Sequence, residues 1–150
     1  MINLKSRWFI AIPFLILTCY MSLIFSIGMP YRDDYARLIE GYFWWDHDGR
    51  PLANLFIYIL NGGGVLTDVA PLSQALSIFI SLFVCYTISE KVIGSRTLYA
   101  LISPTFLFLS PFYLQNLVYR FDIFSMSLSL AILCIPFYFL TSRRFVVFIV

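Results

Sequence analysis

The sequence predicts an all-α integral membrane protein. Of its 150 residues, 61% are hydrophobic and only 12% are charged, whereas a soluble domain is about 45–50% apolar and about 25% charged. The mean hydropathy is +0.86. Several uncharged runs approach the length of about 20 residues that a helix needs to cross a bilayer core. These observations exclude an ordinary soluble enzyme, a disordered chain and a disulfide scaffold. The net charge of +2 gives no indication of a nucleic-acid partner.

About four transmembrane helices are expected, at residues 8–27, 70–89, 97–117 and 123–140. The first two contain no charged residue and end near glycine, proline or a basic residue. The third contains Pro104 and Pro111, and because proline removes a backbone donor, this span is expected to be broken or kinked.

The segment Phe145–Val150 resembles the start of a fifth helix. Six apolar residues are too few to cross the hydrocarbon core. We therefore expect residues 1–150 to form one polytopic membrane domain, which is the N-terminal part of a longer protein.

The distribution of lysine and arginine predicts the orientation. Basic pairs precede the first span, separate the second from the third and follow the fourth: Lys5 with Arg7, Lys91 with Arg96, and Arg143 with Arg144. Cytoplasmic loops carry an excess of such residues. The N-terminus is therefore expected in the cytoplasm, and residues 28–69 on the outer side.

The outer loop, residues 28–69, carries most of the polar character. It contains nine of the charged residues and six of the seven glycines. We expect short amphipathic helices here, one over Asp34–Trp45 with an Asp33–Arg37 ion pair, and one from Pro51 to Leu60. Trp44 and Trp45 would anchor the first at the headgroup level.

Two adjacent carboxylates, Asp33 and Asp34, are the candidate catalytic residues. Acids are favoured at a helix N-terminus, so a structural role is one interpretation. The other is a general base at the membrane surface, which needs a carboxylate near the hydroxyl that it deprotonates.

Other polar groups give weaker signals. Asp46-His47-Asp48 resembles a metal-binding D-x-D motif, but no βαβ pattern accompanies it, and we expect no metal site. Arg120 and Asp122 either fix two helix ends or place Arg120 against an anionic group such as a lipid phosphate. The three cysteines lie in separate apolar runs, which supports neither a disulfide framework nor a zinc site.

Three segments together resemble the phage-type serotype-converting O-antigen glucosyltransferases, the GtrII-like family. They are Tyr31-Arg32-Asp33-Asp34, Asp48-Gly49-Arg50-Pro51-Leu52 and Gln115-Asn116-Leu117-Val118-Tyr119-Arg120-Phe121-Asp122. Their order, spacing and topology agree with that family over most of the chain. One departure is Ile123, where a small polar residue is expected.

The resemblance implies a GT-C-type fold and a polytopic enzyme of the bacterial inner membrane. Such an enzyme would move glucose from undecaprenyl-phosphate-glucose to an O-antigen repeat of lipopolysaccharide on the periplasmic side, without a nucleotide sugar or cofactor. Asp33 or Asp34 would be the base, and substrate would be bound by Arg32, Arg50, Arg120 and Asp122. A truncated, inactive prophage remnant is also compatible with the length.

A different class of function is a small non-enzymatic membrane protein, such as a lipid-linked-sugar flippase or an assembly partner. That function predicts polar side chains along a path through the spans. The spans here are almost free of charge, which favours a site on the outer loop.

Overall fold

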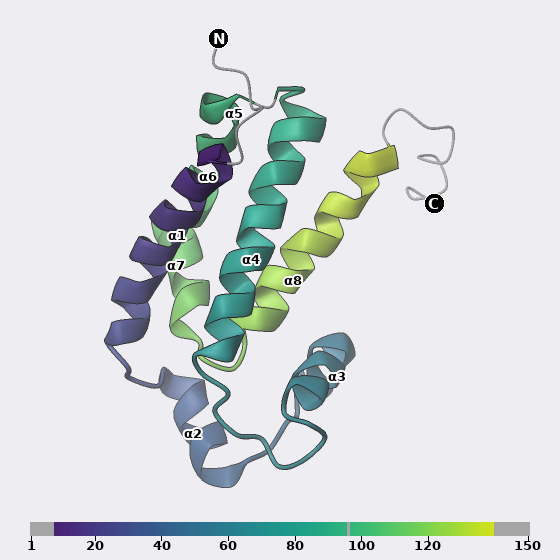
Figure 1. Ribbon diagram of the computed structural model, residues 1–150. Coiled ribbons are helices and arrows are strands. Elements are labelled where there is room, and N and C mark those ends of the chain that lie inside the picture. Colours follow the sequence, from purple (N-terminus) through teal and green to yellow (C-terminus); the bar gives the residue numbers. More distant parts are fainter. Residues whose placement is uncertain (1–7, 96, 140–150) are drawn as a thin grey trace.

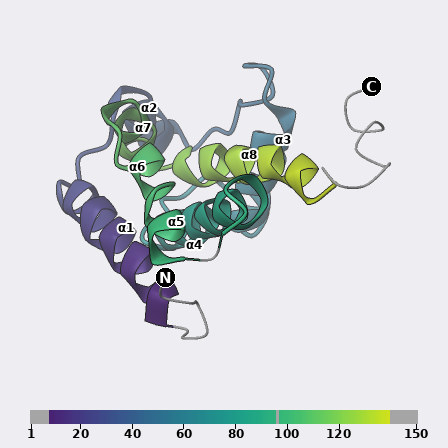
Figure 2. The ribbon, with the colours of Figure 1, turned by 90° about the horizontal axis from the view of Figure 1, so that it is seen from above.

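A computed structural model describes residues 8–95 and 97–139, and only the backbone of Trp8, Arg32, Leu114, Tyr138 and Phe139. The described residues form helices and connecting turns, with no strand among them. Helices α1 (Trp8–Ser26), α4 (Leu72–Thr87) and α8 (Ile123–Cys134) run side by side, and the short helices α2 (Arg32–Glu40) and α3 (Pro51–Leu60) gather at one end (Figure 1). Viewed from above, α4 lies between α1 and α8 (Figure 2).

Helix α4 is the centre of the packing, because it contacts both α1 and α8. Its buried residues include three serines spaced four apart, Ser73, Ser77 and Ser81, together with apolar residues such as Ile78 and Val84. The hydroxyls of Ser77 and Ser81 donate to the backbone carbonyls four residues earlier, each at 2.8 Å. Small side chains let two apolar helices approach closely without a hydrophobic driving force between them.

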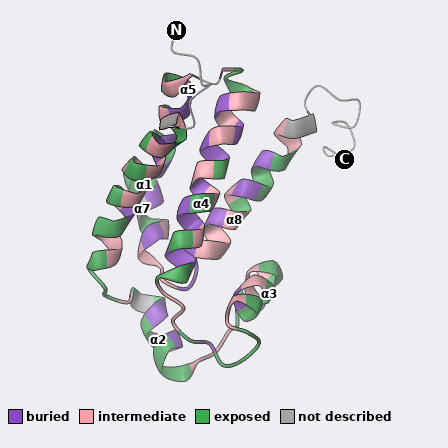
Figure 3. Ribbon diagram, in the orientation of Figure 1, coloured by how far each residue is buried: buried purple, intermediate pink, exposed green. Residues whose placement is uncertain are grey.

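The apolar core lies between these helices, and the outer faces remain exposed (Figure 3). Leu17 and Met21 of α1 are fully buried, whereas Leu15 and Leu23 of the same helix are 56% and 70% exposed. A helix that exposes large apolar side chains is suited to hydrocarbon rather than water. This pattern agrees with a helical membrane protein.

Two described helices have the length and composition of membrane spans, over Phe9–Ser26 and Leu72–Val92. They correspond to the first two expected spans, and the second continues through a π-helical turn, Ile88–Val92. The third expected span is broken, as its prolines predicted. Its halves, Leu98–Phe108 and Pro111–Val118, meet at 51° and count as a third span if they are taken together.

The third span consists of α5 (Leu98–Ile102), α6 (Thr105–Phe108) and α7 (Pro111–Val118). The fourth, α8 with the 3₁₀ turn Ile135–Phe139, is a shorter apolar helix. The described residues therefore contain two or three candidate spans, and the expected count of four is not established. The expected fifth helix at Phe145–Val150 lies outside the described residues.

Gly41 ends the first helix of the outer segment earlier than expected. The prediction of a helix over Asp34–Trp45 was wrong in its bounds, because α2 runs from Arg32 to Glu40. Gly41 adopts φ 66°, and its N–H donates to the carbonyl of Arg37. A Cβ on Gly41 would lie 2.7 Å from a methyl of Val65, so only glycine allows this close approach. The second helix, α3, has the predicted bounds.

The α4–α8 packing predicts the effect of enlarging a contact residue. Ser77→Leu should destabilise the bundle by about 1–3 kcal/mol, because the added atoms have no space in the packed interface. Phe79→Leu on the exposed face of α4 is the matched control. Thermal unfolding in detergent measures both, and equal midpoints for the two variants would contradict the packing.

The two ends of α4 test the orientation predicted by the basic residues. Val65 precedes α4 and Ile93 follows it, and both are exposed. With the native cysteines replaced, Val65→Cys should react in spheroplasts with an impermeant thiol reagent, and Ile93→Cys should react only after lysis. The reverse pattern would invert the topology.

Candidate functional site

Helix α2 places its two acids in different environments. Asp33 is exposed, whereas Asp34 is fully buried and Arg37 is 5% exposed. Asp34 and Arg37 are three residues apart and therefore share one face of the helix. Both acids lie in the first turn, where the helix dipole favours a carboxylate. In the folded protein one carboxylate therefore faces solvent and the other faces the interior.

The Asp34 carboxylate connects α2 to the turn between α7 and α8. Its Oδ2 accepts the backbone N–H of Arg120 at 2.7 Å, and its Oδ1 is buried without a hydrogen-bond partner. Burial raises the pKa of Asp34, and the hydrogen bond from Arg120 opposes that shift. The contact joins residues that are 86 positions apart in the sequence.

The side chain of Arg120 connects its own turn to two further segments. Its Nη2 lies 2.7 Å from Asp68 Oδ2, and its Nη1 donates to the carbonyl of Gly28 at 3.0 Å. The turn before α8, the segment before α4 and the end of α1 are therefore held together by one guanidinium. These contacts engage both terminal nitrogens of the group.

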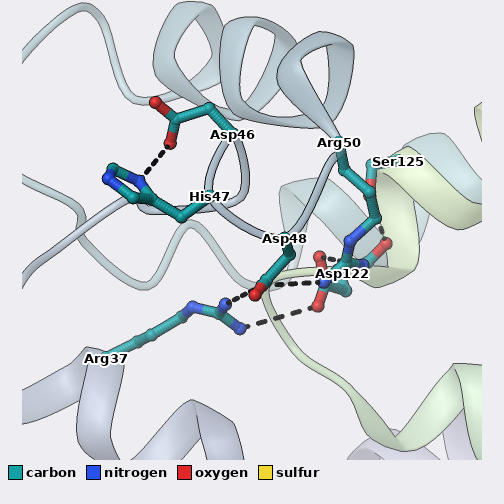
Figure 4. Close-up of polar contacts among 7 residues, drawn as sticks. All are labelled: Arg37, Asp46, His47, Asp48, Arg50, Asp122 and Ser125. Carbon is teal, nitrogen blue, oxygen red and sulfur yellow. Dashed lines mark hydrogen bonds and ion pairs between the residues drawn. The ribbon is translucent and has the colours of Figure 1, made fainter.

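Four charged side chains form a second group, which we call the arginine–aspartate cluster: Arg37, Asp48, Arg50 and Asp122 (Figure 4). Asp122 Oδ2 lies 3.6 Å from Arg37, and its Oδ1 lies 3.6 Å from Arg50. Asp48 Oδ2 lies 3.8 Å from Arg37 and 3.4 Å from Arg50. Two arginines thus share two carboxylates. Arg37 comes from α2, Asp48 and Arg50 from the 46–50 turn, and Asp122 from the residue before α8.

Trp45 supports the buried arginine of the cluster. The guanidinium carbon of Arg37 lies 4.1 Å from the centre of the Trp45 ring, and this tryptophan is fully buried. Stacking of a desolvated guanidinium on an indole is favourable because the ring face carries negative potential. The arrangement fixes the position of Arg37 independently of its carboxylate partners.

The cluster is loosely paired. Charge-assisted hydrogen bonds between nitrogen and oxygen are usually about 2.7–2.9 Å long, whereas the four contacts here are between 3.4 and 3.8 Å. Burial raises the pKa of Asp122, and the charges of Arg50 and Arg37 oppose that shift. Arg37 Nε and Trp45 Nε1 are buried without hydrogen-bond partners. These donors are enclosed by the protein, so the cation of the cluster that a ligand can reach is Arg50, whose side chain is 41% exposed.

The structure brings together only some of the predicted site residues. Arg50 and Asp122 meet in the cluster. Arg120 lies in the neighbouring group with Asp68, and Asp33 is exposed on α2. Arg32 begins α2. The expected Asp33–Arg37 ion pair is replaced by the pairs of Arg37 with Asp122 and Asp48, because Arg37 turns into the protein.

Asp46 and Asp48 point in different directions (Figure 4). Asp46 Oδ1 lies 3.2 Å from His47 Nδ1, while Asp48 joins the cluster. Among residues 8–95 and 97–139, no group of three or more His, Cys, Asp and Glu side chains could hold a metal ion.

Sequence reasoning missed Arg37 and Trp45 as members of the site. The helical spacing of Asp34 and Arg37 was a usable signal, because residues three apart share a face. Trp45 was expected as a membrane-surface anchor, but it is fully buried, and Trp44 is 61% exposed. The sequence contains no local signal that distinguishes these two tryptophans.

Comparison with known proteins supports the resemblance found in the sequence. The profile of the Glucosyl transferase GtrII family matches residues 22–150. An uncharacterized 55.3 kDa protein encoded in the gtrB 5′ region of Salmonella phage P22 is 32% identical over 136 residues, which cover 91% of this chain and 28% of that protein. No solved structure matches.

The match covers 28% of the phage relative, so this chain spans only about a quarter of that protein's length. The family match includes α2, the 46–50 turn and the start of α8, which are the segments that build the arginine–aspartate cluster. On the family match and this identity, the chain belongs to the GtrII glucosyl transferase family.

Proposed function

We propose that this chain carries the catalytic surface of an enzyme that transfers glucose from undecaprenyl-phosphate-glucose to an O-antigen repeat. Membership of the GtrII family supports glucosyl transfer, and the apolar helices support a membrane location. The transfer would take place on the periplasmic face of the inner membrane and change the serotype of the host. The phage relative is consistent with a prophage origin.

The observation that carries the proposal is the position of the charged groups. The arginine–aspartate cluster and the exposed Asp33 are built on α2 and on the turns at one end of the apolar helices (Figure 1). A lipid-linked sugar has its phosphate at the headgroup level, where those helices end. Carboxylate and guanidinium groups would therefore meet the reacting atoms at the membrane surface.

In the proposed reaction, an acceptor hydroxyl attacks the anomeric carbon of the donor glucose. A bond forms between the hydroxyl oxygen and that carbon, the bond from the carbon to the phosphate oxygen breaks, and the lipid phosphate leaves. Asp33 takes the proton of the hydroxyl as general base. We assign this role to Asp33 because its carboxylate is exposed and one helical turn from Arg37.

Asp34 is assigned a positioning role. Its carboxylate is buried and already accepts the N–H of Arg120, so an acceptor sugar would have no direct access to it. Fixing α2 to the 119–122 turn holds Asp33 at a constant distance from the cluster. Small displacements of a catalytic group are costly, because reacting atoms must lie about 3–3.5 Å apart.

Arg50 is the proposed partner of the leaving phosphate. Its side chain is 41% exposed, whereas that of Arg37 is 6% exposed. A guanidinium matches two phosphate oxygens at once, and it would stabilise the charge that develops as the donor bond breaks. Arg32, Arg120 and Asp122 remain candidates for substrate binding.

The non-enzymatic alternative receives less support from the buried polar groups. The hydroxyls of Ser77 and Ser81 are bonded to carbonyls of their own helix. Side chains that are satisfied in this way contribute to helix packing and do not by themselves form a transport path.

Removal of the base tests the assignment of the two acids. In the active enzyme that carries this sequence, Asp33→Asn should lower the transfer rate about 10²–10⁴-fold while leaving the thermal midpoint unchanged. Asp34→Asn should lower the midpoint and reduce the rate less. Asp46→Asn, another exposed acid, is the control. Glucose transfer at the native rate by Asp33→Asn would refute the base role.

Arg120 gives a second test, because its ion pair with Asp68 and a role in phosphate binding predict different results. If the pair is the main function, Arg120→Lys and Asp68→Asn should destabilise the protein similarly and leave the KM for the donor unchanged. If Arg120 binds phosphate, only Arg120→Lys should raise that KM. We expect the first result, since both terminal nitrogens of Arg120 are engaged.

A further inference from the structure

A groove lies between the start of α3 and residues 125–132 of α8, next to the arginine–aspartate cluster. Its volume is about 330 Å³. One wall is formed by α3 and the other by α8, which are in contact; the lining includes Leu52, Phe56, Met126, Ser129 and Ile132, with Arg50 at one end. The mechanism described above uses Arg50 but none of the apolar lining of this groove.

The groove runs from the surface into the depth of the helices. Arg50 lies at the level of Asp122, the residue before α8. Ile132 is ten residues further along, and at 1.5 Å per residue this is about 15 Å. That distance is about half of the hydrocarbon core of a bilayer, which is about 30 Å thick. A molecule lying in the groove would therefore have one end at the headgroup level and the other near the middle of the membrane.

The chemistry changes along this length. The deeper lining is made of aliphatic, thioether and aromatic groups together with serine hydroxyls, and the outer end has the guanidinium of Arg50. Arg50 contacts the exposed Asp48 at 3.4 Å, and an exposed pair of this kind is weak. An anion can displace Asp48 from Arg50, while Asp122 remains neutralised by Arg37, which lies 3.6 Å away.

A second pocket of about 280 Å³ contains Arg120 and residues of α1 and α7. It is less suited to an anionic ligand, because Arg120 is already 2.7 Å from Asp68 and donates to Gly28. Binding there would break a short, partly buried ion pair. Of the two pockets, the one at Arg50 therefore offers the more available cation.

The dimensions favour a single extended chain as the occupant. A helix with its side chains is about 10–12 Å across, and a volume of about 330 Å³ would hold only a short piece of one. A phospholipid brings two acyl chains, whereas a polyprenyl phosphate brings one. The groove thus matches a ligand that has one apolar chain and a phosphate at the outer end of that chain.

We propose that the α3–α8 groove holds the first isoprenoid units of a polyprenyl phosphate, with the phosphate at Arg50. This inference rests on the proposed function for its biological meaning, because that lipid is then the glucose donor. By holding the isoprenoid chain of the donor, the groove would direct the anomeric carbon of its glucose towards α2. Arg50 and the groove walls would together select a lipid phosphate over a soluble sugar phosphate.

Photo-crosslinking in nanodiscs tests the assignment directly in the native protein. The probe is a polyprenyl phosphate with a diazirine in its second isoprenoid unit, and mass spectrometry locates the adducts. We expect adducts on α3 and α8 at groove residues such as Phe56 and Ile132. Adducts confined to the pocket beside Arg120, or displacement by a tenfold excess of phosphatidylglycerol, would overturn the proposal.

The dissociation constant of the same lipid, measured for the native protein and for variants, provides a second test. Ser129→Trp, which fills the groove, and Arg50→Ala should each weaken binding at least tenfold. Leu23→Trp on the exposed face of α1 and Ile27→Trp in the second pocket should change it less than twofold. Loss of binding in Ile27→Trp alone would place the lipid in the other pocket.

These experiments distinguish a failure of the groove assignment from a failure of the proposed function. If the lipid crosslinks elsewhere and Asp33→Asn still abolishes transfer, the groove assignment is wrong and the enzyme assignment stands. If the groove binds the lipid but no glucose is transferred, the groove assignment stands alone. Polyprenol without phosphate should bind native protein and Arg50→Ala equally, and a tenfold difference between them would refute the phosphate contact.

Discussion

The turn at residues 119–122 is the place where the outer segment is attached to the apolar helices. Its backbone donates to Asp34, its arginine pairs with Asp68, and its last residue, Asp122, receives Arg37 and Arg50. Burying these charges is costly, and each is therefore matched by an opposite charge or a backbone donor. Phe121 of the same turn is buried in an apolar cluster with Trp45, Ile57 and Leu66, so the turn attaches the outer segment through apolar contacts as well as through charge.

The helices behind the turn are organised by a different principle. Helix α4 packs on α8, and the hydroxyls of its buried residues Ser77 and Ser81 donate to carbonyls of its own backbone. In hydrocarbon, helices associate through close packing and hydrogen bonding, because apolar surface gains nothing by leaving lipid. The α4–α8 contact positions Asp122, the residue before α8, and Asp122 in turn contacts Arg37 and Arg50 of the charged cluster.

The buried acids and the exposed polar groups of the site have different roles in the proposed function. The buried carboxylates, Asp34 and Asp122, hold segments together, while Asp33 and Arg50 keep accessible polar groups beside them. In the proposed function, Asp33 as base and Arg50 as anion-binding group must keep a constant separation, because reacting atoms must lie about 3–3.5 Å apart. The attachment of α2 and of the 46–50 turn to the same aspartate, through Arg37 and Arg50, meets that requirement.

The sequence by itself determined the helical membrane class, the bounds of α3, the break at Pro104 and Pro111, and the family. These properties depend on local signals: apolar length, proline, glycine and short motifs. Tertiary structure alone decided that Asp34 is buried while Asp33 is exposed, and that Trp45 rather than Trp44 lies in the interior. It also directed Arg37 to Asp122 instead of Asp33. Adjacent residues of the same type have the same local propensities, so their environments are set by the distant segments that pack against them.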